Sequence, residues 1–447
     1  MSMFYRSMIE KLDAWATKPE RKPLILRGAR QVGKTTIVDQ FGGRFDHYIK
    51  LNLEVSSDRQ FFEQGYSAKQ FIDALFFNKN LRQSQQRKTL LFIDEIQQSP
   101  EAVSLLRYFY EELPWLHVIG AGSLLENLID VHISFPVGRV EYAFMYPMTF
   151  SEFLLASDER KAADMIESAS VPEYAHTKML SLFHEYTLLG GMPGITATYL
   201  ANNKDLIATQ PLYEGLLLGY QDDVEKYEHH RSRVRIIRHV ITTAPFSAGG
   251  RIKFQGFGTS NYGSREIGEA LRMLEKTMLL RLIYPTVNTT PPFEPNLKKS
   301  PKLHFLDTGL MNFACGLQGE FFGLEDLHNL YRGKVIEHIV GQELMAHYTS
   351  PLNPLSFWVR EKKQSNAEID FVLSQGHKLF PIEVKAGKQG TLKSLQSFMD
   401  HVDHQHAVRL YAGNMLQSQM SSLQGRTFTL HSIPYYLASK VLQILKT

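Results

Sequence analysis

The nine residues GARQVGKTT, at positions 28–36, constrain the fold of this 447-residue chain more than any other stretch. They follow the apolar run 22–28, which is typical of a buried strand, and they lead into 34–41, which has the pattern of a helix. A strand, a glycine-rich turn and a helix in this order place the backbone N–H groups of the turn around a phosphate. The sequence therefore predicts a phosphate-binding loop at the end of a strand.

This loop carries the groups that a nucleoside triphosphate with Mg²⁺ requires. Lys34 would place a positive charge at the β and γ phosphates, and Thr35 would offer a hydroxyl to Mg²⁺. The start of the helix adds the positive end of its dipole. We therefore expect ATP and Mg²⁺ as cofactors, with the nucleotide surrounded by Gly28, Ala29, Arg30, Gln31, Val32, Gly33, Lys34, Thr35 and Thr36.

An acidic motif downstream supports the same site. The four apolar residues 90–93 lead into Asp94 and Glu95, at the carboxyl end of a predicted strand, where open α/β sheets bind ligands. Asp94 would hold Mg²⁺, directly or through water, and Glu95 would accept a proton from the attacking water. The alternative is a pair of solvated acids at a strand end.

Two further residues are expected at the nucleotide, each with an open alternative. Ser123 follows the predicted strand 116–122 and would either sense the γ-phosphate or cap the next helix. Arg139 would either reach a phosphate, in its own or a neighbouring subunit, or form a structural ion pair.

Charge and cysteine content narrow the class of protein. The chain has 49 basic and 46 acidic residues, so its overall charge gives no case for nucleic acid or a membrane. Its one cysteine, Cys315, cannot form an internal disulfide, which favours a reducing cytosol. The first residues lack a signal-peptide pattern, and no stretch approaches the roughly 18 apolar residues of a membrane span. We expect a cytoplasmic protein without a membrane anchor.

The pattern along the chain predicts an α/β protein in three parts. Short strands alternate with helices up to about residue 148, which is typical of a doubly wound parallel sheet, and long helical segments follow. A helix and an apolar strand share residues 265–285, in the order of a winged helix, and the strand–helix alternation begins again at 331. We expect an ATPase domain with a helical extension at 1–200, a winged-helix-like domain at 201–330 and a small α/β domain at 331–447.

Charged residues alternate with apolar ones along two C-terminal segments, 367–374 and 381–387, which are predicted strands. If these strands form a hairpin, Asp370, Glu383 and Lys385 converge on the face opposite the apolar residues. Two carboxylates and a lysine are the groups that metal-assisted phosphodiester cleavage needs. The alternative is an ordinary strand pair with an ion pair on its solvent side.

Six motifs in order resemble those of a large family of bacterial and archaeal AAA-type ATPases. They are LRGARQVGKTT, LLFIDEIQ, FPVGRVEYAFMYPMTFSEFL, YTLLGGMPG, PKLHFLDTGL, and EIDFVL with PIEVKAG. That family carries a C-terminal domain of unknown function related to restriction-endonuclease folds. The resemblance implies an AAA-type P-loop parallel sheet, a helical and winged-helix-like middle, and a C-terminal α/β restriction-endonuclease-like domain.

The resemblance also implies roles for the C-terminal residues. Asp370, Glu383 and Lys385 match the catalytic D…E-x-K pattern of restriction-endonuclease folds. Glu337, on the preceding helix, matches the acid that such folds often place beside the metal, so the implied metal ligands are Glu337, Asp370 and Glu383. The resemblance supplies no substrate.

Two functions stay open at this point. In the first, Lys34 and Glu95 catalyse ATP hydrolysis, and the nucleotide state controls a nuclease-like domain that acts on DNA or RNA. In the second, the protein is an ATP-dependent switch or scaffold whose C-terminal domain binds DNA or protein without cleavage. A basic helix face with Arg231, Arg235 and Arg238 would either follow a phosphate backbone or be a solvated surface. A second copy of the chain is a further expected partner.

Overall fold

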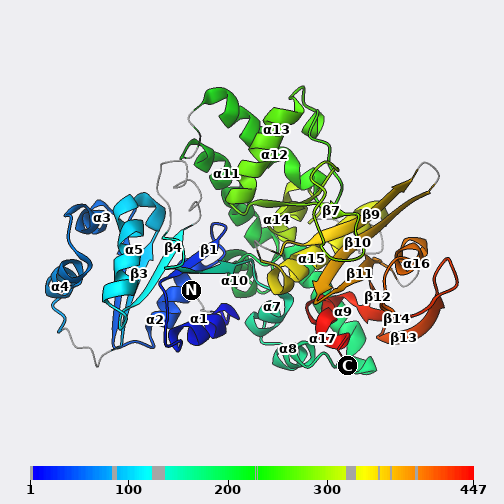
Figure 1. Ribbon diagram of the computed structural model, residues 1–447, viewed down its shortest axis with the longest axis horizontal. Coiled ribbons are helices and arrows are strands. Elements are labelled where there is room, and N and C mark those ends of the chain that lie inside the picture. Colours follow the sequence, from blue (N-terminus) through cyan, green and yellow to red (C-terminus); the bar gives the residue numbers. More distant parts are fainter. Residues whose placement is uncertain are drawn as a thin grey trace. The chain divides into compact units, whose positions relative to one another are not determined.

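The computed structural model describes residues 4–82, 88–122, 136–226, 228, 230–318, 329–350, 353–362, 365–387 and 391–446. The chain groups into two compact units, one made of Met1–Tyr146 with Lys276–Met278 and the other of Pro147–Glu275 with Leu279–Thr447 (Figure 1). The finer division into domains at 1–200, 201–330 and 331–447 remains a prediction.

The first unit contains a five-stranded sheet in the order β2-β3-β4-β1-β5. All four neighbouring pairs are parallel, as the alternation of strands and helices predicts. The elements in chain order are α1 (Met8–Ala16), β1 (Leu24–Gly28), α2 (Lys34–Gly42), β2 (His47–Asn52), α3 (Ser56–Glu63), α4 (Ala68–Asn78), β3 (Thr89–Asp94), α5 (Pro100–Glu112), β4 (His117–Gly122) and β5 (Glu141–Met145).

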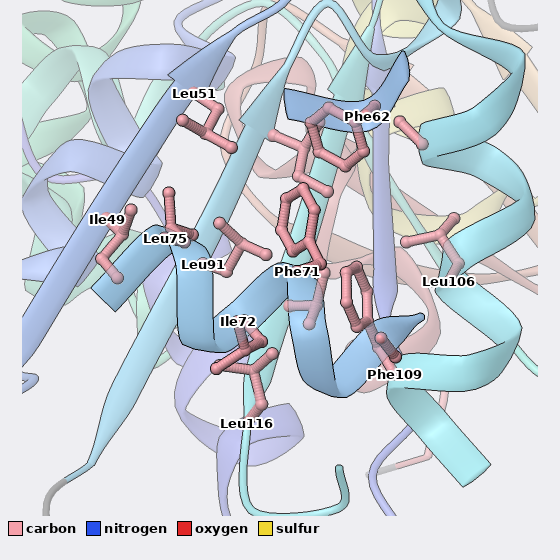
Figure 2. Close-up of a cluster of buried hydrophobic side chains, with 14 of the residues drawn as sticks. Ile49, Leu51, Phe62, Phe71, Ile72, Leu75, Leu91, Leu106, Phe109 and Leu116 are labelled. Carbon is pink, nitrogen blue, oxygen red and sulfur yellow. The ribbon is translucent and has the colours of Figure 1, made fainter. Parts of the chain in front are cut away.

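One side of this sheet packs on three helices through a continuous apolar cluster (Figure 2). Strands β2 and β3 contribute Ile49, Leu51 and Leu91, and Phe71 of α4 packs against rings of α3 and α5. Helix α4 begins with a capping box, because the Ser67 side chain accepts from the Gln70 N–H and Gln70 accepts from the Ser67 N–H. This cluster fixes the sheet whose carboxyl end carries the predicted site.

The second unit begins with helices and continues with a short two-stranded antiparallel sheet. The helices are α7 (Phe150–Ala156), α8 (Arg160–Glu167), α9 (His176–Leu189), α10 (Pro193–Ala201), α11 (Gln210–Asp222), α12 (Arg231–Ser247) and α13 (Ser264–Lys276). After α12, Arg251 forms a β-bridge with Lys302, and after α13 the strands β6 (Leu280–Ile283) and β8 (Lys302–Phe305) pair antiparallel. The helix and apolar strand that the sequence predicts at 265–285 are α13 and β6, and a winged-helix-like domain at 201–330 remains a prediction.

A seven-stranded mixed sheet forms the C-terminal part, in the order β13-β14-β12-β11-β10-β9-β7. Its strands and flanking helices are β7 (Pro285–Thr286), α14 (Thr308–Ala314), α15 (Asn329–Tyr348), β9 (Ser356–Lys362), β10 (Ser365–Gln375), β11 (Lys378–Val384), α16 (Lys393–Met399), β12 (His406–Tyr411), β13 (Leu416–Ser421), β14 (Thr427–Pro434) and α17 (Val441–Ile444). Strands β10 and β11 form the predicted hairpin, but β11 is interior and buried along six of its seven residues. The ion pair between Lys385 and Glu383 does form, at 2.6 Å, with the Lys385 side chain 24% exposed and that of Glu383 9% exposed, so the alternative of an ordinary strand pair with an ion pair stays open.

The motifs GGMPG and LDTGL meet in a buried polar network of this second unit. The Asp307 carboxylate accepts hydrogen bonds from the N–H groups of Gly191 and Leu310, at 2.6 and 3.0 Å. Gly191 has no room for a side chain, because a Cβ there would lie 2.2 Å from the Met148 carbonyl oxygen. Burial raises the pKa of Asp307 to about 6. These motifs therefore hold backbone segments together rather than form a second phosphate loop.

We expect Phe71→Ala to destabilise the first unit by about 3–5 kcal/mol, because the buried ring leaves a cavity. Phe77→Ala on the same helix is the matched control, since Phe77 is 89% exposed and Phe71 fully buried. Urea unfolding followed by circular dichroism should show a lower midpoint for Phe71→Ala alone. Equal midpoints for the two variants would contradict this packing.

Candidate functional site

The phosphate loop, residues 28–35, has a backbone that depends on its glycines. Gly33 caps helix α2 with a φ of 98°, a left-handed conformation that favours glycine. Gly28 ends β1, and a Cβ there would lie 2.6 Å from the Met145 carbonyl oxygen of the neighbouring strand β5. Gln31 also has a positive φ of 61°. The turn between β1 and α2 is therefore the curled loop that the sequence predicts.

Lys34 is buried at the start of α2, and its ammonium points back at the loop. Nζ donates to the carbonyl oxygens of Gly28 and Ala29, both at 2.8 Å. Burial lowers the pKa of Lys34 to about 8, although the charges of Glu95 and Asp94 act in the opposite direction. The ammonium has hydrogen bonds but no close anionic partner among these contacts, so phosphate oxygens would be stronger acceptors for it.

Thr35 and Asp94 lie together beside Lys34. The Thr35 hydroxyl donates to Asp94 Oδ2 at 2.9 Å, which brings one hydroxyl and one carboxylate oxygen to the same point. Burial raises the pKa of Asp94, and the hydrogen bond from Thr35 opposes that rise. Oxygen ligands of these two kinds are those that Mg²⁺ takes in nucleotide sites. The pair therefore fits Mg²⁺ at the place that the sequence predicts.

Glu95 follows Asp94 in a strained backbone conformation, with a φ of 52°. The Gln97 side-chain amide donates to its carboxylate, which fixes the direction of the side chain. Burial raises the pKa of Glu95. A desolvated carboxylate held by one amide at a strand end is suited to accept a proton.

The other residues predicted for the nucleotide divide into three groups. Arg30, Val32 and Thr36 lie in or directly after the loop, as expected from their positions. Ser123 lies outside the described residues. Arg139 Nε donates to Glu111 Oε1 at 2.9 Å on the surface of the unit, so in this structure it forms the ion pair that was its alternative. Its role at a phosphate stays a prediction.

Arg6 is a residue of this site that sequence reasoning missed. It is buried, and its guanidinium donates to the carbonyl oxygens of Val32 and Tyr146, at 2.7 and 2.6 Å. It therefore ties the phosphate loop to the end of β5. No local pattern reveals this role, because Arg6 precedes Val32 by 26 residues.

A carboxylate cluster forms a second candidate site in the C-terminal part. Strands β10 and β11 pair with Phe371 opposite Ile382, so Asp370 and Glu383 are neighbours, and Asp370 Oδ2 accepts from the Val384 N–H at 2.8 Å. Lys385 Nζ donates to Glu383 Oε1 at 2.6 Å. The structure thus brings the predicted Asp370, Glu383 and Lys385 together. We use the name carboxylate cluster for Glu337, Glu368, Asp370 and Glu383.

Lys302, a residue to which the sequence analysis gave no role, lies within this cluster. Its Nζ is 2.7 Å from Glu337 Oε1, 3.1 Å from Glu368 Oε1 and 3.6 Å from Asp370 Oδ1. Burial lowers the pKa of Lys302, but the nearby carboxylates outweigh burial and raise it. Burial and the charge of Asp370 raise the pKa of both Glu337 and Glu383. In the sequence, Lys302 belongs to the motif PKLHFLDTGL, and this is the one signal that could have drawn attention to it.

The cluster in this arrangement does not fit a divalent ion. The ammonium of Lys302 already contacts two of the three predicted metal ligands, Glu337 and Asp370. Across the described ranges, no group of three or more His, Cys, Asp and Glu side chains is arranged to hold a metal ion. The metal and catalytic roles of Glu337, Asp370, Glu383 and Lys385 therefore stay predictions.

A parallel five-stranded sheet with this loop and these acids defines an AAA-type P-loop ATPase domain, within an overall α/β protein. Comparison with known families agrees, because residues 20–154 match the family described as AAA domain. Residues 332–435 match a domain of unknown function, DUF4143, and residues 180–320 match another, DUF8612. The chain therefore combines an AAA-type P-loop ATPase domain with a DUF4143 domain at its C-terminal part.

Relatives and solved structures are distant. The uncharacterized protein MJ1637 of Methanocaldococcus jannaschii is 22% identical over 413 residues, which cover 88% of this chain and 81% of the relative. The Walker-type ATPase PABY2304 of Pyrococcus abyssi is 16% identical with a TM-score of 0.45, over 70% of this chain and 96% of that one. The Aeropyrum pernix ORC1 protein, solved in complex with DNA, is 13% identical with a TM-score of 0.28, over 72% and 92%.

None of the helices in the described ranges is both long and apolar enough to cross a bilayer.

We expect Arg6→Ala to weaken ATP binding. Hydrogen bonds to charged groups contribute about 1.5–3 kcal/mol each, so the loss at the Val32 carbonyl should raise the Kd for ATP roughly tenfold or more. Arg21→Ala is the matched control, because Arg21 Nη2 donates to the Pro114 carbonyl at 2.7 Å, away from the loop. Titration with a fluorescent ATP analogue measures both, and equal affinities would show that Arg6 does not support the loop.

Proposed function

We propose that this protein binds ATP with Mg²⁺, hydrolyses the nucleotide, and uses the nucleotide state to control its C-terminal domain. The observation that supports the proposal most strongly is the position of Lys34, whose ammonium is held only by loop carbonyls in the contacts above. A buried ammonium whose hydrogen bonds go to neutral carbonyls gains more from a phosphate than a solvated lysine would. The matched AAA domain supports the ATPase class independently.

Each residue of the site would have a separate role at the nucleotide. Lys34 would exchange the carbonyls of Gly28 and Ala29 for phosphate oxygens, while the loop N–H groups orient the phosphates. Thr35 and Asp94 would hold Mg²⁺, which when bound supplies charge neutralisation at the transferred phosphate. Glu95, directed by Gln97, would take the proton of the attacking water.

Two roles of the C-terminal domain each have an observation in their favour. The approach of Asp370, Glu383 and Lys385 supports a nuclease-like domain that acts on nucleic acid. The ammonium of Lys302 among the carboxylates supports the second role, in which the domain binds DNA or protein without cleavage. We favour the second role for the arrangement described, because cleavage of this kind needs a divalent metal.

We also propose a second copy of the chain as a partner and the cytoplasm as the location. The ion pair between Arg139 and Glu111 lies on the surface, so the guanidinium could leave it to reach the nucleotide of a neighbouring copy. The free thiol of Cys315 fits a reducing compartment. The basic face of α12 gives less support to nucleic acid, because Arg238 is bound to Glu225 at 2.9 Å.

Two substitutions test ATP hydrolysis. Lys34→Ala should raise the Kd for ATP, because the buried charge for the phosphates is lost. Glu95→Gln should keep ATP binding but lower kcat by about 10²–10⁴-fold, the range typical of a lost general base. Nucleotide titration and a phosphate-release assay measure the two effects.

The controls remove the same charges elsewhere in the unit. Lys69→Ala and Glu112→Gln change exposed residues of α4 and α5 and should leave both quantities unchanged. Hydrolysis at the wild-type rate in both Lys34→Ala and Glu95→Gln would refute the proposed site.

A further inference from the structure

Strand β13 is an outer strand of the seven-stranded sheet, with β14 on one side only (Figure 1). The two strands pair antiparallel in an unbroken register, from Leu416 opposite Ser432 to Ser421 opposite Thr427. Across the described ranges, no second strand pairs with β13. The other side of β13 is therefore an open edge, whose backbone N–H and C=O groups form a template for a further strand.

The hydrogen-bond pattern of the hairpin shows which backbone groups point to this open edge. The Ser422 N–H donates to the Arg426 carbonyl oxygen at 2.8 Å, so these two residues form a hydrogen-bonded pair at the end of the hairpin. Hydrogen-bonded and non-hydrogen-bonded pairs alternate along an antiparallel ladder. The N–H and C=O groups of Gln417 and Gln419 therefore point away from β14.

The backbone of Ser421 supports this direction. Its carbonyl oxygen accepts a hydrogen bond from the Gln396 side chain of α16 at 3.0 Å, as expected of a group that points away from β14. Gln417 and Gln419 lie nearer the middle of the strand, and both residues are exposed. A strand that approaches from solvent can therefore reach their backbone groups.

The open edge of β13 lacks the features that protect the other sheet edges of this protein. Residues 412–425 contain no charged side chain. In contrast, the opposite edge strand β7 has two residues and begins with Pro285. The edge strands β2 and β5 of the first unit carry Lys50 and Glu141. Short strands, proline and charge all discourage pairing at an edge, and β13 has none of them.

We propose that β13 pairs with β13 of a second copy of this chain, antiparallel and across a twofold axis beside Ser418. The pairing joins the two seven-stranded sheets into one continuous sheet. This inference deepens the proposal of a second copy as a partner, because it assigns a surface to that partner. It does not depend on ATP hydrolysis.

The register of the pair follows from two conditions. A twofold axis perpendicular to the sheet keeps each face on its own side, so opposite residues must come from the same face of the strand. The outward backbone groups of Gln417 and Gln419 must also form the hydrogen-bonded pairs. Both conditions are met when Gln417 of one copy lies opposite Gln419 of the other. Residues 416–420 of the two copies then overlap, and Ser421 keeps its bond to Gln396.

The side chains of β13 are complementary to themselves in this register. Leu416 is 56% exposed, and it lies opposite Met420 of the second copy, a residue that packs on the apolar core of the sheet. The amide groups of Gln417 and Gln419 meet on the other face, where each can both donate and accept hydrogen bonds. Apolar and polar side chains thus each face their own kind, which favours a second copy over an unrelated strand.

Sedimentation velocity of the full-length protein without nucleotide tests the pairing. The wild type should change from monomer to dimer as the protein concentration rises. Gln417→Lys with Gln419→Lys should raise the Kd of the dimer at least ~10-fold, because each lysine then lies opposite a lysine of the second copy and like charges repel.

Gln417→Glu with Gln419→Lys is the matched control, since it places charges at the same two positions. In the proposed register each glutamate lies opposite a lysine, so this variant should form the dimer at least as tightly as the wild type. Gln419→Pro removes an N–H that points outward and no bond to β14, so it should also prevent the dimer. Circular dichroism and the Tm show whether each variant is folded.

Four results would overturn the proposal. The first is a wild type that stays monomeric at every concentration, which would leave the edge to a strand of another protein. The second is a dimer of equal Kd in all folded variants, which would mean that another surface forms it. The third is equal weakening by the two charged pairs, which would refute the register. The fourth is a dimer that Arg139→Ala abolishes and Gln417→Lys with Gln419→Lys leaves intact, which would support the nucleotide contact instead.

Discussion

The structure depends on one electrostatic constraint, which is that a buried ammonium must find partners. Taking a charge out of water is expensive, and removal of one partner from a buried ion pair costs about 3–5 kcal/mol. Lys34 and Lys302 are both buried, and they meet this constraint in opposite ways. Neutral carbonyl oxygens hold Lys34, whereas carboxylates surround Lys302. The pKa of Lys34 is accordingly lowered and that of Lys302 raised.

The difference between the partners of Lys34 and those of Lys302 decides which of the two lysines is available to an anionic ligand. An ammonium held by carbonyls retains its full charge for an incoming anion, which is what a phosphate loop requires. The positive charge of an ammonium inside a carboxylate cluster is already balanced by the carboxylates. It therefore stabilises the cluster and attracts an anionic ligand only weakly. The same residue type therefore marks a ligand site in the first unit and a closed site in the second. This difference supports the proposal above that ATP chemistry takes place in the ATPase domain.

Sequence reasoning predicted the local structure correctly where that structure depends on neighbouring residues. The order of strand, loop and helix at 28–36 is local, and so is the position of Asp94 and Glu95 at the end of β3. Alternation also predicted that Asp370 and Glu383 share a face, but it could not tell that β11 is interior, because burial depends on the strands beside it. Lys302 was missed because 68 residues separate it from Asp370. Strand β13 was missed because its residues LQSQMS are polar, as an edge strand permits.

The most direct test of the account is where Mn²⁺ binds in the wild-type protein with a non-hydrolysable ATP analogue. Anomalous diffraction from crystals grown with Mn²⁺ would locate the ion. The account predicts a peak beside Thr35 and Asp94 next to the phosphates, and none in the carboxylate cluster while Lys302 keeps its contacts with Glu337 and Asp370. A peak between Glu337 and Asp370 with Lys302 still in place, or no peak beside Thr35, would contradict it.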